Sequence, residues 1–156
     1  MEKVTFTPIG MVINAFGDPA DPKSMRNSIS TLALDPIYAG ALEGLEKFSH
    51  ILVIYYFDRS PGYVEKVHPM GDPSIPMRGV LATRSPSRPN PIALTLVKMI
   101  SVKGSDVEVT GLDALNGTPI LDIKPYEEHF DAPVGLERER DPAYTPRDGG
   151  SKRQGV

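Results

Sequence analysis

Short apolar runs rich in β-branched residues, divided by prolines and glycines, make up most of this 156-residue sequence. Such runs are typical of strands, and they leave no long amphipathic helix. We expect strands at Val4–Ile13 (broken near Pro8), Ile29–Leu34, Phe48–Phe57, Val80–Thr83, Ile92–Val102, Val107–Thr110 and Thr118–Ile123. Ala41–Lys47 is expected to form one or two helical turns, and Gly104-Ser105-Asp106 a hairpin connection.

The number and shortness of these strands predict an all-β fold. A small antiparallel β-barrel of six or seven strands with short helical turns hides the strand edges best. No glycine-rich phosphate loop is present, so a Rossmann domain is not expected. The length fits one domain.

The segment Phe48–Phe57 differs from the other predicted strands because both of its faces are apolar. Phe48, Leu52, Ile54 and Tyr56 lie on one face, and Ile51, Val53, Tyr55 and Phe57 on the other. A strand of this kind in a small domain is expected to line the core with one face and contact something else with the other. A second copy of the chain would fit, so we predict a homodimer.

Composition excludes several functions. Without cysteine there is no disulfide, zinc–thiolate site or cysteine nucleophile. The three histidines lack the spacing of a metal site, so no metal is expected. The N-terminus has no apolar signal core, and the longest apolar run, Ile51–Phe57, is too short to span a membrane. We therefore predict a soluble, cytoplasmic protein with no membrane association.

Charge gives a mixed indication about nucleic acid. The net charge of −3 argues against a nucleic-acid binder. However, the stretch from Pro73 to Ser105 contains no acidic residue and holds five cations: Arg78, Arg84, Arg88, Lys98 and Lys103. One basic strip could bind a polyanion while the whole chain stays acidic. A solvated face with chance clustering explains the same pattern equally well.

The proline-rich segment Ala82–Ile92 presents two arginines on a stiff support, because proline fixes its own backbone and restricts the preceding residue. Guanidinium groups suit carboxylate or phosphate ligands. The segment also fits a rigid crossover with solvated arginines. Three further candidates are the Gly111-Leu112-Asp113 turn, the pair Asp122 and Lys124 on one strand face, and Phe57-Asp58-Arg59 at a strand exit. Each is also compatible with a turn or a simple ion pair.

Several blocks together resemble the TsaA-like (YaeB, VirR-like) family, known through its tRNA N6-methyltransferase members. They are Pro8–Gly10, Gly44–Ile51, Gly79–Ile92, Gly111–Asp113 and Asn116–Tyr126, in the family's order. The resemblance covers about residues 6–131. It implies a barrel domain over 1–131, followed by a C-terminal extension over 132–156 that is partly mobile, above all at Asp148–Gly155.

The resemblance also implies a function. Family members bind S-adenosyl-L-methionine, form homodimers and methylate N6 of threonylcarbamoyladenosine beside the anticodon of threonine tRNA. Family cofactor contacts fall here on Met25, Arg26, Asn27, Asp58, Arg59, Arg84, Leu94, Gly111, Leu112 and Asp113. As RNA contacts we expect Arg88, Asn90, Lys98 and Lys124. Asp113 and Asp122 are the carboxylates to test as catalytic bases.

Two alternatives remain open at this point. The chain could be a non-catalytic barrel that binds RNA or a small ligand, and the basic strip would serve that equally well. It could also be a methyltransferase that acts on a small molecule, which the net negative charge makes reasonable.

Overall fold

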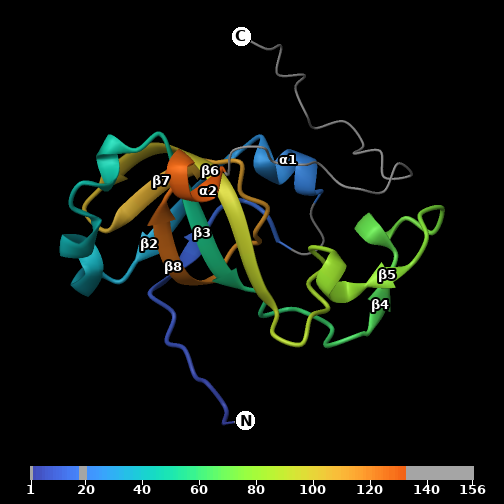
Figure 1. Ribbon diagram of the computed structural model, residues 1–156. Helices are drawn as coiled ribbons and strands as arrows, with labels where there is room; N and C mark the ends of the chain where they lie inside the picture. The colour runs from blue at the N-terminus through green and yellow to red at the C-terminus, as the bar shows by residue number, and fades with distance from the viewer. Residues whose placement is uncertain (1, 18–20, 133–156) are drawn as a thin grey trace. The chain divides into compact units, whose positions relative to one another are not determined.

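Six antiparallel strands close into a barrel in the computed structural model, which describes residues 2–17 and 21–132. Around the barrel the strands follow the order β1-β2-β7-β6-β3-β8 (Figure 1). Their bounds are β1 Gly10–Ile13, β2 Ile29–Leu34, β3 His50–Tyr56, β6 Ile92–Lys103, β7 Asp106–Thr110 and β8 Pro119–Pro125. The predicted all-β barrel is confirmed.

The other elements are short. Two strands, β4 (Lys66–Val67) and β5 (Arg78–Gly79), form a separate two-stranded sheet. The helices of the barrel unit are α1 Pro22–Arg26 and the 3₁₀ helices η1 Pro36–Leu42, η2 Leu45–Lys47, η3 Pro69–Gly71 and η4 Val80–Ala82. A second unit begins at residue 127; in its described part, Glu128–Asp131 form α2. The extension expected to be partly mobile, apart from Ala132, lies outside the described residues.

Most predicted strands are present with bounds shifted by a few residues, and the hairpin at Gly104 connects β6 to β7. The first strand is shorter than expected, because it begins only at Gly10. The strand predicted at Val80–Thr83 is wrong. It is the 3₁₀ helix η4, and the carbonyls of Val80 and Thr83 accept hydrogen bonds from the Arg88 guanidinium rather than from a neighbouring strand.

The core lies inside the barrel and is made by the inward residues of every strand. Strand β3 shows the alternation clearly: Ile51, Val53 and Tyr55 are buried, while Leu52 and Ile54 on the outer face are half-buried. A bulge where β3 pairs with β8 shifts the register between Ile54 and Tyr55. Burying aliphatic side chains from six strands supplies the main driving force for folding.

Gly10 lies where β1 packs most tightly against β2. A Cβ atom there would overlap the Ala33 carbonyl oxygen and lie 2.7 Å from the Leu34 Cα atom, both in the backbone of β2. We expect Gly10→Ala to lower the free energy of unfolding by about 2–3 kcal/mol, since a closed barrel cannot separate two paired strands without strain. Urea denaturation measures this. Gly40→Ala is the control, because a Cβ at Gly40 meets nothing within 4 Å; equal stability losses in the two variants would contradict the prediction.

Among the described residues, no helix is long and apolar enough to cross a membrane. The same part of the chain contains no group of three or more histidine and acidic side chains placed to hold a metal ion.

Candidate functional site

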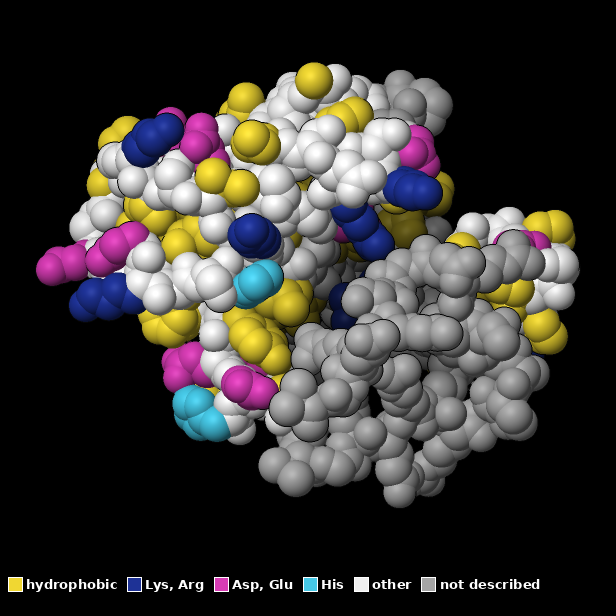
Figure 2. Space-filling model, turned by 90° about the horizontal axis from the view of Figure 1, so that it is seen from above, with side chains coloured by type: hydrophobic (Ala, Val, Ile, Leu, Met, Phe, Trp, Pro, Cys, Tyr) yellow, Lys and Arg dark blue, Asp and Glu magenta, His cyan; other side chains and the backbone are white. Residues whose placement is uncertain are grey.

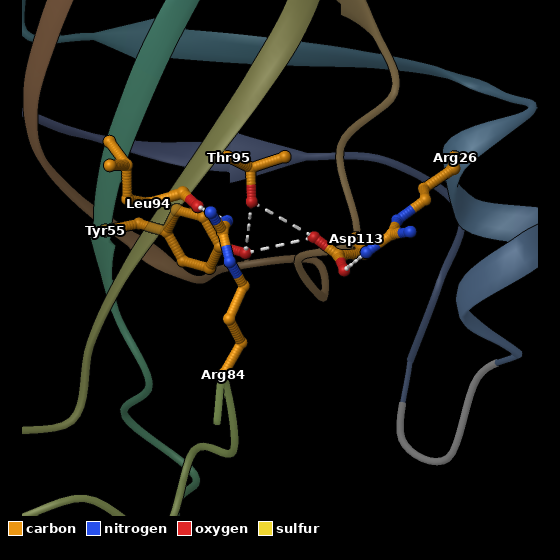
Figure 3. A network of polar contacts seen from close by, with 6 residues as sticks. All are labelled: Arg26, Tyr55, Arg84, Leu94, Thr95 and Asp113. Carbon is orange, nitrogen blue, oxygen red and sulfur yellow. Dashed lines mark hydrogen bonds and ion pairs between the residues drawn. The ribbon is translucent and has the colours of Figure 1, made fainter. Parts of the chain in front are cut away.

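The carboxylate of Asp113 is the centre of a polar network at one end of the barrel (Figure 3). Asp113 follows β7 and the turn at Gly111, whose φ of +95° favours glycine. Its chain neighbours Leu112 and Ala114 are buried in the core. With both neighbours fixed in the core, the Asp113 side chain lies at the edge of the core and stays partly exposed, at 21%.

Helix α1 brings a cation to one carboxylate oxygen. Asp21 caps this helix by accepting hydrogen bonds from the backbone and hydroxyl of Ser24, which lower the pKa of the Asp21 carboxyl. Buried Met25 fixes the helix to the barrel, and the Arg26 guanidinium lies 2.5 Å from Asp113 Oδ2. The Arg26 carbonyl accepts a hydrogen bond from the Gly111 amide, so helix and turn are joined directly.

Two hydroxyl groups from the barrel interior contact the other oxygen. The Tyr55 hydroxyl on β3 and the Thr95 hydroxyl on β6 each donate to Asp113 Oδ1, at 3.2 Å. The two hydroxyl oxygens are 3.1 Å apart. Burial, followed by the negative charge of Asp113, raises the pKa of Tyr55, so this phenol keeps its proton and remains a donor.

The proline-rich loop is held by one of its own side chains and by one from the segment after β3. Arg88 Nη1 donates to the Thr83 carbonyl at 2.6 Å, and the Ser60 hydroxyl donates to the Pro86 carbonyl at 2.8 Å. Arg84 Nη1 donates to the carbonyl of Leu94 on β6 at 3.0 Å, which places its exposed guanidinium beside the barrel strand. Of the two arginines expected on this loop, Arg88 is therefore turned onto carbonyls of the loop itself, and Arg84 lies against β6.

Two adjoining cavities lie at this site and share Phe57 and Asp113. The larger, of about 520 Å³, is bounded by α1, β6, the Gly111 turn and the proline-rich loop. The smaller, of about 270 Å³, is lined mainly by apolar groups, with Asp58 and Arg59 among its polar members. Figure 2, a view of the molecule from above, shows several Lys and Arg side chains near its centre, with hydrophobic and acidic side chains beside them.

The structure gathers most of the predicted cofactor residues around these cavities. Arg26, Arg84, Leu94, Gly111 and Asp113 line the larger one, and Met25, Asp58, Arg59 and Asp113 line the smaller one. Two of the predicted residues line neither cavity. The Leu112 side chain is fully buried in the core, and Asn27 ends helix α1.

The remaining predicted residues are dispersed. Asp122 and Lys124 form an ion pair of 2.7 Å with both side chains exposed, and neither lines a cavity; Asp122 raises the pKa of Lys124. Asn90 and Lys98 are exposed and also lie outside the cavity linings. Arg88 lines the larger cavity while its Nη1 holds the loop carbonyls.

From the sequence, neither Tyr55 nor Thr95 was expected at the site, and Phe57 entered only as the first residue of the Phe57-Asp58-Arg59 segment. Tyr55 was placed on one apolar face of its strand, without a role at the site. A tyrosine among aliphatic inward positions is a usable signal, because a buried hydroxyl needs a partner. Thr95 becomes its neighbour only through the β3–β6 register, which places it beside Val53. Phe57 packs edge-on against Tyr55, with ring centroids 5.5 Å apart.

Comparison with known proteins gives the family of the chain. The chain is similar to a "probable S-adenosyl-L-methionine-binding protein" of Methanothermobacter thermautotrophicus, with 41% identity over 133 residues, 83% of this chain and 95% of the relative. It is also similar to the tRNA (adenine(37)-N6)-methyltransferase of Rattus norvegicus, with 38% identity over 144 residues, 83% of this chain but only 32% of that enzyme.

Among solved structures, a crystal structure of TrmO matches with a TM-score of 0.72 and 31% identity, and the match covers 94% of this chain. The chain accounts for 66% of that protein's length, and for about a third of the rat enzyme. The family model described as the tRNA-methyltransferase O N-terminal domain matches residues 11–132. The chain therefore belongs to the tRNA-methyltransferase O N-terminal domain family.

Proposed function

We propose that this protein binds S-adenosylmethionine in the two adjoining cavities and transfers its methyl group to N6 of threonylcarbamoyladenosine beside the tRNA anticodon. The observation that carries the proposal is the Asp113 network, because Asp113 lines both cavities and the larger of them is also lined by Arg26 and Arg84. The names of the relatives support the cofactor and the reaction class.

The lining residues fit the chemistry of this cofactor. Its carboxylate needs a cation, which Arg26 or Arg84 supplies. Its ammonium and ribose hydroxyls need an acceptor, which Asp113 supplies. Its adenine needs an apolar surface, such as the one that Met25 and Phe57 give to the smaller cavity. The larger cavity alone has the volume of a typical small-molecule site.

Orientation is the main contribution expected from the protein. S-adenosylmethionine supplies an activated methyl group on a positively charged sulfur that leaves as a neutral thioether. The chain then has to hold donor and acceptor in line, which can be worth roughly 7–11 kcal/mol in favourable systems. Asp113 is better suited to binding the cofactor than to removing the N6 proton of the substrate. Both of its carboxylate oxygens already have hydrogen-bond partners, namely Arg26, Tyr55 and Thr95. Asp122 lies outside the cavity linings, so the geometry favours neither carboxylate as the base.

For the RNA we propose an approach along the acid-free segment 73–105, part of which borders the larger cavity. Exposed Asn90 and Lys98 lie on this segment, and Lys124 lies on β8, two strands from β6 around the barrel. These groups are suited to phosphate contacts, which position RNA without reading its sequence. Arg88 would contribute chiefly by holding the loop that carries Arg84.

We also propose that two chains associate through the outer face of β3 and β6. On this face Leu52 lies opposite Leu96, and Ile54 lies opposite Leu94. Leu94 and Leu96 are each 46% exposed. A contiguous apolar patch of this kind on a sheet is typical of an interface, and a two-fold axis lets one patch cover its copy.

The test has two stages. Calorimetric titration of the purified chain with S-adenosylmethionine establishes binding, and absence of binding refutes the proposal. Incubation with S-adenosylmethionine and tRNA that carries threonylcarbamoyladenosine, followed by nucleoside mass spectrometry, should yield the N6-methylated nucleoside. Matched tRNA with unmodified adenosine at that position is the control.

The second stage also separates the alternatives. Cofactor binding without any methyl transfer to tRNA would support a binding module or an enzyme for small molecules. Methylation of the control tRNA to the same extent would contradict threonylcarbamoyladenosine as the acceptor.

A further inference from the structure

The two oxygens of Asp113 have different surroundings (Figure 3). Oδ1 accepts from two hydroxyl groups that belong to the barrel wall, and Tyr55 among them is 2% exposed. Among the described residues, Oδ2 contacts Arg26 alone, whose side chain is 58% exposed. The carboxylate is thus held on one side by groups of the barrel wall and on the other by an exposed side chain, which a ligand can replace if it brings a donor or a positive charge of its own.

This asymmetry lies where the two cavities meet, since Asp113 lines both. From it we propose, on the basis of the function proposed above, that Tyr55 and Thr95 are positioning residues for cofactor binding. They hold Oδ1 from inside the barrel, so that Oδ2 is directed to the cavities and contacts a positively charged or hydroxyl-bearing part of S-adenosylmethionine. As the cofactor binds, the Arg26 guanidinium leaves Asp113 and contacts the cofactor instead.

The hydroxyl groups are suited to this role for two reasons. Hydrogen bonds to an ionised acceptor are stronger than those between neutral groups. A buried hydroxyl without a partner is also unfavourable, so each donor is committed to the carboxylate or to the other hydroxyl. They come from the adjacent strands β3 and β6 of a closed barrel, which keeps the position of Oδ1 fixed when loops or α1 move.

Substitutions that remove only the hydroxyl groups test the proposal in the full chain. We expect Tyr55→Phe and Thr95→Val each to weaken S-adenosylmethionine binding in calorimetry by about tenfold, as expected for loss of a hydrogen bond to a charged group. Thr95→Ser, which keeps the hydroxyl, should bind within about twofold of the original protein. Tyr38→Phe and Thr31→Val are matched controls, because neither residue lines a cavity.

A double-mutant cycle shows whether the hydroxyls act through Asp113. In the Asp113→Ala background, adding Tyr55→Phe should change the affinity by less than about twofold. A full tenfold loss there would overturn the proposal, as would unchanged affinity of Tyr55→Phe alone. Equal losses for Thr95→Val and Thr95→Ser would also overturn it, because packing rather than the hydroxyl would then be responsible. If the unsubstituted chain itself does not bind S-adenosylmethionine, it is the proposed function that fails.

Discussion

We expect Arg84→Ala to abolish S-adenosylmethionine binding while the barrel stays folded. The guanidinium of Arg84 lies at the larger cavity, placed by its hydrogen bond to the Leu94 carbonyl and by the loop that Arg88 holds. It is exposed and contributes nothing to the core, so its removal should not unfold the protein. Loss of a guanidinium that pairs with the ligand carboxylate is expected to lower affinity by at least about a hundredfold, or roughly 2.7 kcal/mol.

Calorimetric titration measures this loss, and the thermal midpoint without ligand measures the fold. Arg84→Lys is the matched variant. It keeps the charge without the planar fork, so an intermediate affinity is expected. Arg88→Ala should behave differently, lowering both the thermal midpoint and the affinity, because Arg88 also stabilises the loop. If Arg84→Ala binds S-adenosylmethionine with the same affinity as the unsubstituted chain, Arg84 does not pair with the ligand carboxylate.

Ile54→Glu converts the proposed dimer into a monomer. Ile54 lies within the apolar patch on the outer face of β3, between Leu94 on β6 and Asp122 on β8. A carboxylate there would be buried in the interface beside a second carboxylate, without a cation of its own. Light scattering should show the mass fall from twice 17.0 kDa to 17.0 kDa.

Ile13→Glu is the control for this prediction, because Ile13 is 44% exposed on β1, away from β3 and β6. This variant should keep the mass of the dimer. A single-chain mass for the unsubstituted protein at micromolar concentration, or a dimeric Ile54→Glu variant, would contradict the proposed interface.

The barrel was predictable because side chains alternate between the two faces of each strand, and this alternation is visible in consecutive residues of the sequence. Phe48–Phe57 is the clearest case, since its inward and outward sets separate in the structure as alternation requires. The 3₁₀ helix η4 was not predictable in this way. Its run Val80–Thr83 has strand-like composition, and only the hydrogen bonds from Arg88 show that no strand partner takes its carbonyls. The two-stranded β4–β5 sheet was also missed, since each strand has only two residues.

The candidate site was predictable only in part, for a related reason. The family resemblance indicated Arg26, Arg84 and Asp113, which meet at the cavities. Tyr55 and Asp113 are 58 positions apart in sequence, and only barrel closure brings them together. The surroundings of Asp122 depended on a bulge: the register shift beside Ile54 leaves Ile120 inside the barrel and Asp122 exposed. No local pattern reports such a shift.

Strand β3 carries two adjacent residues with separate tasks in these proposals. Tyr55 faces inward to the Asp113 network, and Ile54 faces outward to the apolar patch. If association of two chains shifts Ile54 by a fraction of an ångström, Tyr55 moves with it, because the two residues are joined by one peptide bond. The contacts of Asp113 with the ligand would then change as well. We therefore expect dilution of the protein to change its apparent cofactor affinity, and titrations at several chain concentrations should separate intrinsic binding from the contribution of self-association.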